Sequence, residues 1–82
     1  MNDKLLIKIS DLNLASTLLC LGHDVLGIDN TNPKRVFFYF DQNDKVVSSV
    51  KDYWGDGIRV NPKVLANYRR ELLSRIYQED TK

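Results

Sequence analysis

Residues 35–41 read Arg35-Val36-Phe37-Phe38-Tyr39-Phe40-Asp41 and form the clearest β-strand pattern in the chain. Side chains along a strand alternate between its two faces. Val36, Phe38 and Phe40 therefore share one face, and Phe37 and Tyr39 share the other. Because both faces carry apolar side chains to bury, we predict that this strand lies at the centre of its sheet.

Two further strands and a helix are expected before this stretch. A turn cluster at residues 30–34 would join it to an extended segment at 25–29, so the pair reads as a hairpin. A first strand is predicted at residues 5–9. Ser10-Asp11 is typical of a helix start, and the helix that follows should run from Leu12 to Leu21 and end at Gly22. Only a narrow polar edge lies outside its apolar stripe: Asn13, Ser16, Thr17 and Cys20.

The second half of the chain predicts two helices separated by a short strand. Asp44 can cap a helix that begins at Lys45 and ends before the Gly-Asp-Gly stop at residues 55–57. Residues 58–60 read as a brief extended piece. Asn61-Pro62 is the strongest helix-start signal in the chain, because asparagine accepts free amide hydrogens and proline suits the first helical position. This last helix should run to about Gln78.

The predicted fold class is therefore α+β, a single small domain over residues 1–82 with the order βαββαβ plus a long C-terminal helix and a frayed tail at 79–82. This order is a variant of the ferredoxin-like, or split-βαβ, motif. The two crossover helices would cover one face of the sheet. The last helix would cover the other face and bury Phe37 and Tyr39, because its apolar arc is unusually wide: Val64, Leu65, Ala66, Tyr68, Leu72, Leu73, Ile76 and Tyr77.

The composition excludes several classes of protein. The chain has 82 residues, 12 of them basic and 11 acidic, for a net charge of +1, so it is neither a polybasic nucleic-acid tail nor a typical disordered chain. Its longest apolar run, residues 36–40, is far too short to span a membrane. The N-terminal residues lack the pattern of a secretory signal. We therefore expect a cytoplasmic protein with no membrane partner.

No pattern of catalytic or metal-binding residues stands out. Cys20 and His23 are the only cysteine and histidine, which leaves no structural zinc cluster and no recognisable nucleophile–base pair. We interpret His23 as a surface or capping residue and Cys20 as an inert, half-buried thiol. The Gly-Asp-Gly segment lacks the length and the lysine of a phosphate-binding loop. The expectation is a protein that is not an enzyme and uses no cofactor.

The charge is unevenly distributed along the chain. Positions 58–77 carry five basic residues against the single acid Glu71, a local charge of 5 − 1 = +4, and the five are Arg59, Lys63, Arg69, Arg70 and Arg75. Lys63 and Arg70 share the predicted outer face of the last helix. An acidic protein or a phosphate backbone could dock there. The alternative is an ordinary solvated helix face.

Arg69 has a distinctive position, and two aromatic residues are further candidate contacts. Arg69 falls inside the predicted apolar arc, where it needs an intramolecular partner, most simply an aspartate of the hairpin or of a loop, or else an oligomer or ligand interface. Tyr53 and Trp54, beside the glycine-containing turn, resemble the aromatic anchors of binding surfaces. Core packing is the default interpretation of both rings.

The aromatic strand also invites comparison with RNA-recognition motifs, whose third strand stacks bases on aromatic side chains. The agreement is poor. The interior glycine of that motif is missing, the first strand offers no aromatic residue, and the last helix is expected to cover the face that carries Phe37 and Tyr39.

Several segments together resemble a family of small phage, prophage and bacterial proteins catalogued only as a domain of unknown function. The segments are Ser10-Asp11-Leu12, Leu14-Ala15, Leu18-Leu19, Leu21-Gly22-His23, Gly27-Ile28-Asp29, Arg35-Val36-Phe37-Phe38, Phe40, Asp52-Tyr53-Trp54 and Val60-Asn61-Pro62. The resemblance spans about residues 8–77. It implies the fold and a mobile-element origin, and it transfers no catalytic residue.

These observations support two functional hypotheses. In the first, the chain is a non-enzymatic accessory protein of phage or prophage type that acts as an interaction module and binds a host or phage protein, or a second copy of itself. In the second, it is an accessory protein that binds nucleic acid through Arg59, Lys63, Arg70 and Arg75.

Overall fold

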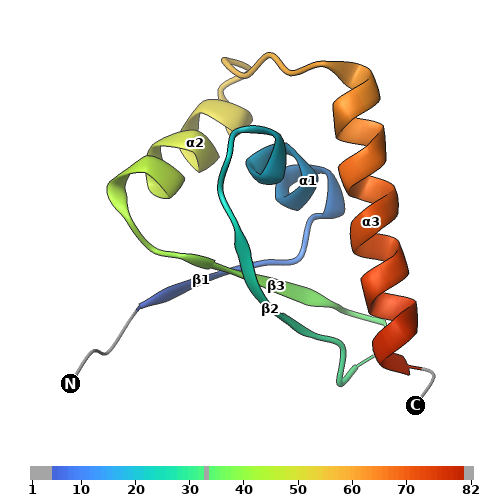
Figure 1. Cartoon of the computed structure of the whole chain (residues 1–82). Coiled ribbons are helices and arrows are strands. Elements are labelled where there is room, and N and C mark those ends of the chain that lie inside the picture. The colour runs from blue at the N-terminus through green and yellow to red at the C-terminus, as the bar shows by residue number, and fades with distance from the viewer. Residues whose placement is uncertain (1–4, 33, 81–82) are drawn as a thin grey trace.

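The computed structural model describes residues 5–32 and 34–80 and shows a small α+β fold (Figure 1). Three strands and three helices follow one another along the chain. They are β1 (Leu6–Ile9), α1 (Leu12–Cys20), β2 (Val25–Asp29), β3 (Phe37–Asp41), α2 (Asp44–Trp54) and α3 (Pro62–Asp80). The predicted fold class and the βαββα part of the order are confirmed. The predicted turn at residues 30–34 includes Pro33, which lies outside the described residues, as do the last two residues of the predicted tail.

The strands form an antiparallel sheet in the order β1-β3-β2, so the prediction that the aromatic strand is central is confirmed. Ile9 and Ile28 both pair with Phe38, and Lys8 and Gly27 both pair with Tyr39. The ladder between β2 and β3 is irregular between Val25 and Gly27. This register separates the two faces of the sheet, with Phe38 and Phe40 on the helical side and Phe37 and Tyr39 on the other.

The core lies between the sheet and the helices. Its buried apolar residues come from five elements: Ile9, Leu14, Ala15, Leu18, Phe38, Phe40, Val46 and Leu72. The middle of the polar edge predicted for α1 is also covered, because Ser16 and Thr17 are 0% and 4% exposed, whereas Asn13 is exposed and Cys20 is half-buried. The hydroxyls of Ser16 and Thr17 donate to the carbonyl oxygens of Leu12 and Asn13, four residues earlier, which removes the penalty for burying them.

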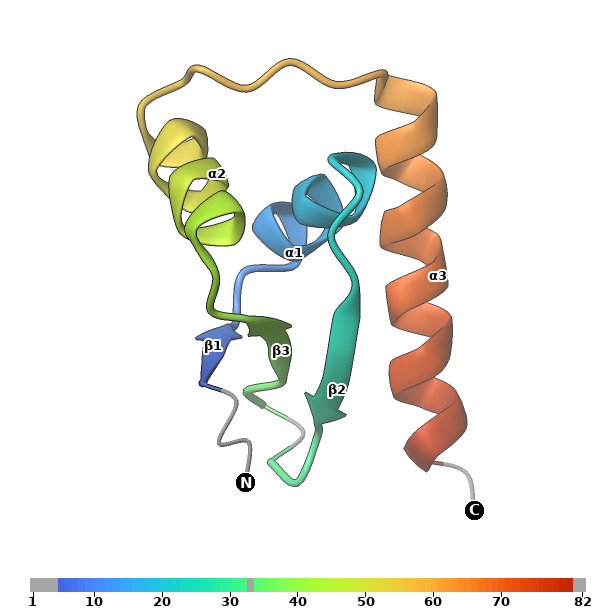
Figure 2. The ribbon, with the colours of Figure 1, turned by 60° about the vertical axis from the view of Figure 1, so that its left-hand side comes forward.

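The predicted position of the last helix is wrong. α3 packs beside α1, and its Leu72 enters the same core as Phe38 and Phe40. It therefore lies on the helical side of the sheet. Figure 2 shows α3 running alongside α1 and β2, and at its C-terminal end the side-chain amide of Asn30 donates to the carbonyl of Ile76 at 3.2 Å. Phe37 and Tyr39 are consequently left without a covering helix. The wide apolar arc of α3 is also only partly used, since Val64 and Tyr77 remain exposed.

The second difference is the missing strand at residues 58–60. Residues 57–61 are neither helix nor strand and form part of the connection between α2 and α3. Because α3 packs against α1, this connection passes over the helices, at a distance from the edge of β1 (Figure 2). In the split-βαβ motif, a fourth strand would pair with that edge.

The predicted helix ends are mostly confirmed. Gly22 has φ +95° directly after α1, as expected of a left-handed terminator, and the Asn61 side chain accepts from the amides of Lys63 and Val64 at the start of α3. The cap of α2 differs from the prediction. Asn43, and not Asp44, accepts from the amide of Val46 at 2.8 Å, so the helix begins one residue earlier.

Candidate interaction site at the α2–α3 connection

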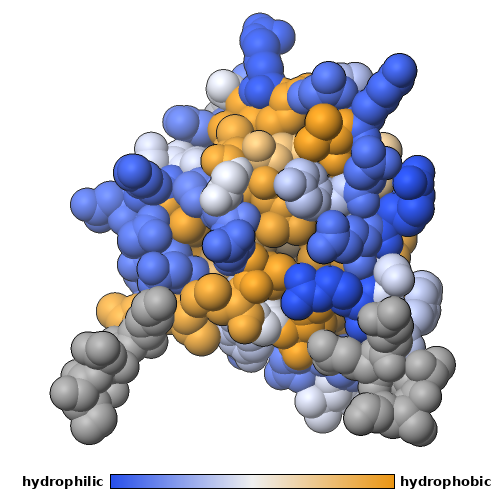
Figure 3. Space-filling view, viewed as in Figure 1, coloured by the Kyte–Doolittle hydropathy of each residue, from blue (hydrophilic) through white to orange (hydrophobic). Residues whose placement is uncertain are grey.

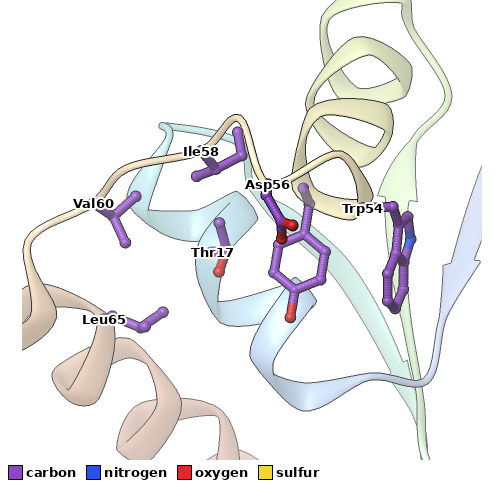
Figure 4. Close-up of a pocket in the computed structure, with 7 residues that line it drawn as sticks. Thr17, Trp54, Asp56, Ile58, Val60 and Leu65 are labelled. Carbon is purple, nitrogen blue, oxygen red and sulfur yellow. The ribbon is translucent and has the colours of Figure 1, made fainter.

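The connection between α2 and α3 roofs a hollow of about 460 Å³ above α1. Figure 4 shows how its labelled residues surround the space: Ile58 and Val60 extend from the connection, Leu65 comes from α3, Thr17 from α1, and Trp54 lies at the opposite end beyond Asp56. The hollow therefore combines an aliphatic side with an aromatic end. A concavity that mixes aliphatic, aromatic and polar residues in this way can accept an apolar side chain or a small ligand.

The aromatic end is formed by Tyr53 and Trp54, whose rings meet edge to face with centroids 5.0 Å apart at an angle of 88°. Tyr53 is half-buried and packs against the core, as predicted. Burial, and then the charge of Asp11, raises the pKa of its hydroxyl. The default interpretation of Trp54 as a core residue is wrong, because its side chain is 64% exposed.

Hydrogen bonds hold the first part of the connection against the end of α2. The amide of Asp56 donates to the carbonyl of Tyr53, and the amide of Gly57 donates to that of Asp52 at 2.8 Å. Asp56 has φ 60°, in the left-handed region that aspartate tolerates better than most residues. This tight turn places Asp56 between Trp54 and the aliphatic part of the hollow.

The structure does not gather the five basic candidates into one patch. Arg59, between two lining residues, and Lys63, at the start of α3, are exposed near the hollow. Lys63 and Arg70 share the outer face of α3, whereas the helical repeat places Arg69 and Arg75 about 120° to either side. Arg70 donates to the side chain of Asn67 at 3.2 Å.

Arg69 forms a hydrogen bond with a different residue from the one predicted. Its Nε donates to Oδ1 of Asn13 on α1 at 3.2 Å, and its side chain is exposed. The hairpin and loop aspartates were expected to pair with it because α3 was expected on the sheet. Since α3 instead packs beside α1, the neutral amide of Asn13 is the group within reach.

The candidate chemical groups lie apart from this hollow. Arg75 is half-buried and lines a second concavity with His23 and Glu71, while Nε2 of His23 lies 3.1 Å from the hydroxyl of Ser49. Cys20 is half-buried, as predicted, and burial raises the pKa of its thiol, which disfavours the reactive thiolate. Within residues 5–32 and 34–80, no three His, Cys, Asp or Glu side chains are placed to hold a metal ion.

One face of the molecule carries an apolar band. Figure 3 shows a band of apolar residues down the middle of this face of the molecule, with hydrophilic residues on both sides. An apolar band with a polar rim is the usual anatomy of a protein-binding surface. In the part of the chain that is described, no helix combines the length and hydropathy needed to cross a bilayer.

A family model described as "Domain of unknown function (DUF5659)" matches residues 4–77, which is nearly the whole chain. The chain belongs to the DUF5659 family. The resemblance predicted from the sequence is thereby confirmed as far as a domain of unknown function is concerned. No curated protein and no solved structure matches this DUF5659 chain.

Sequence reasoning found the aromatic end of the site and missed the rest. Ile58 and Val60 were assigned to a strand, Leu65 to the face of α3 that would cover the sheet, and Thr17 to a polar edge. The signal that could have found them is the run from Trp54 to Asn61. It contains two glycines and spaced aliphatic residues, which is as typical of an irregular lining segment as of a strand.

Proposed function

We propose that this DUF5659 chain is a non-enzymatic interaction module that binds a partner protein by taking one of its apolar side chains into the hollow beside Trp54. The observation that carries the proposal is the exposure of Trp54 at the end of a concavity lined by aliphatic residues. Tryptophan is among the residue types most enriched in binding hot spots. The phage or prophage origin implied by the resemblance fits a small accessory protein of this kind.

The rim favours a partner segment with acidic residues next to its apolar anchor. Arg59 and Lys63 are exposed near the aliphatic side of the hollow, and Asp56 is the acidic lining residue. Complementary charges at a rim contribute mainly to specificity and to the association rate. We therefore expect the hollow to supply affinity and the two cations to select the partner.

Binding of nucleic acid through the basic residues of α3 is the weaker proposal. Only Lys63 and Arg70 share a face of this helix, Arg69 is turned to Asn13, and Arg75 lies beside Glu71. A phosphate backbone tracks a continuous row of cations, and each phosphate contact adds to the salt dependence of binding. α3 offers two such contacts on its outer face.

The Trp54→Ala variant tests the proposed function. We expect peptides selected from a random displayed library on the wild-type chain to carry an apolar or aromatic residue flanked by Asp or Glu. Loss of the Trp54 ring should weaken their binding by about thirtyfold or more, because hot-spot side chains contribute about 2 kcal/mol or more. Isothermal titration of each variant measures this change.

The matched control is Tyr77→Ala. Tyr77 is also an aromatic residue that is 64% exposed, and it lies at the far end of α3. This variant should bind the selected peptides within about twofold of wild type. Selection of no peptide family, or peptides that bind the Trp54→Ala variant as well as wild type, would count against the proposal.

A further inference from the structure

The face of the sheet opposite the helices is open. α1 and α2 lie above the sheet in Figure 1, α3 stands at its side, and no described element covers the lower face. The register places Leu6, Lys8, Phe37, Tyr39 and Asp41 on this face together with Gly27 and Asp29 of β2. Phe37 and Tyr39 are only half-buried there. Two aromatic rings thus stand two residues apart along the central strand, about 6.6 Å, on an accessible surface.

Two cations accompany the Phe37 ring. The ammonium of Lys8 lies 4.6 Å from the ring centroid, and the guanidinium carbon of Arg35 lies 6.0 Å from it. Both side chains are exposed, so each can leave the ring and meet an anion at little cost. Phe37 is therefore an aromatic surface with a positive charge on β1 and another at the start of β3.

The Tyr39 ring is held over β2. A Cβ atom on Gly27 would lie 3.7 Å from Cδ2 of Tyr39, and the Tyr39 hydroxyl donates to Asp29 at 3.5 Å. Hydrogen bonds from the side chain and backbone of Thr31 lower the pKa of Asp29, with smaller contributions from Lys8 and Tyr39, so this acceptor stays ionised. The ring therefore lies close to Gly27 on the neighbouring strand, and the hydroxyl bond to Asp29 orients it.

We propose that this open face binds single-stranded nucleic acid, with consecutive bases stacked on Phe37 and Tyr39 and their phosphates met by Lys8 and Arg35. Stacking on aromatic rings suits unpaired bases because every base has a π-face, and a neighbouring groove of positive charge suits the backbone. Three differences from RNA-recognition motifs were expected from the sequence, and one of them was a last helix covering this face. That difference does not hold in the structure, because α3 lies on the other side of the sheet. This site is distinct from the Trp54 hollow, and neither proposal depends on the other.

The charges on this face predict how such binding behaves. Lys8 and Arg35 are balanced by Asp29 and Asp41, so stacking supplies most of the affinity. Two phosphate contacts on a single strand give a slope of about −1.4 for the logarithm of affinity against the logarithm of salt concentration. A duplex hides its bases and is expected to bind much more weakly.

The test is fluorescence anisotropy with an end-labelled oligouridine and a labelled oligonucleotide of mixed sequence, at about 50 mM salt. We expect wild type to bind both, and the Tyr39→Ala variant to bind about tenfold more weakly. Because Tyr39 packs on Gly27, Lys8→Glu provides a second variant at an exposed position, and a loss of several-fold is expected. Lys63→Glu makes the same charge change on the outer face of α3 and should stay within about twofold of wild type.

Several results would overturn the proposal. The first is no anisotropy change up to about millimolar protein at low salt. The second is a loss in Lys63→Glu equal to that in Lys8→Glu, which would move the binding to α3. The third is equal affinity for a duplex of the same length. The fourth is a wild-type dimer in light scattering that becomes a monomer in the Lys8→Glu variant. That result would mean that a second copy of the chain covers this face.

Discussion

Replacing Phe40 with alanine is expected to lower the free energy of unfolding by about 3–5 kcal/mol. Phe40 lies on the central strand, is 0% exposed, and belongs to the core that joins the sheet to α1, α2 and α3. Its removal loses the burial of the ring and leaves a cavity that a close-packed interior fills only in part. A domain of this size has a total stability of about 4–12 kcal/mol, so the variant loses much of it. Urea unfolding followed by circular dichroism measures the change.

The control for Phe40→Ala is Phe37→Ala, three residues earlier on the same strand. Phe37 is the same residue type, but its ring lies on the open face and is half-buried. We expect this substitution to cost less than half as much as Phe40→Ala, because the removed surface is already partly hydrated. Equal costs for the two variants would mean that both faces of the sheet are covered, which contradicts the structure.

Leu72→Ala is the second substitution with a large expected effect, about 2–5 kcal/mol. Among residues 62–77 of α3, Leu72 is the one that is fully buried in the core, and it is 0% exposed. The side chain connects a helix that has few other fully buried contacts to α1 and the sheet. Its loss should therefore both destabilise the fold and loosen α3. Thermal unfolding should show a fall in midpoint of about 4–8 °C for each kcal/mol lost.

Val64→Ala on the same helix provides the comparison for Leu72→Ala. Val64 lies in the predicted apolar arc and is 40% exposed in the structure. Its truncation should cost less than about 1 kcal/mol, since little buried area is lost. If Val64→Ala were as costly as Leu72→Ala, the whole apolar arc of the helix would be buried. That result would fit the predicted position of the helix on the opposite face of the sheet and would contradict the structure.

Local patterns predicted most of the elements because their causes are local. The alternation in residues 35–41 determines a strand, and Asn61-Pro62 begins a helix at Pro62 because both residues act on backbone groups within one turn. The central position of β3 was also predicted correctly, but the reason given for it holds for one face only, because Phe37 and Tyr39 on the other face are only half-buried. These features need no knowledge of what the segment packs against.

The partner of α3 could not be predicted in this way. A wide apolar arc shows that a helix needs a surface to cover, but it does not specify which surface. The signal that pointed to α1 was present in Ser16 and Thr17, whose small hydroxyl side chains bond to their own helix and allow a neighbouring helix to approach closely. The sequence pattern alone places them on a polar edge.

The candidate sites depend on the same packing of α3. Tyr53 and Trp54 could be found because two adjacent aromatic residues beside a glycine-containing turn stand out in the sequence itself. The aliphatic side of the hollow and the open face with Phe37, Tyr39 and Lys8 depend on where α3 lies, so they became visible only in three dimensions. Arg69 could be found in the sequence, but its partner was predicted wrongly because that partner depends on where α3 packs.

The position of α3 is checked most sharply by nuclear Overhauser contacts between its methyl groups and the aromatic rings of β3. We predict contacts from the methyl groups of Leu72 or Ile76 to Phe38 or Phe40, within the shared core. No contact from α3 to the rings of Phe37 and Tyr39 is expected. Strong contacts from Leu72 to Phe37 or Tyr39 would place the helix on the opposite face of the sheet and contradict both the fold and the open surface inferred from it.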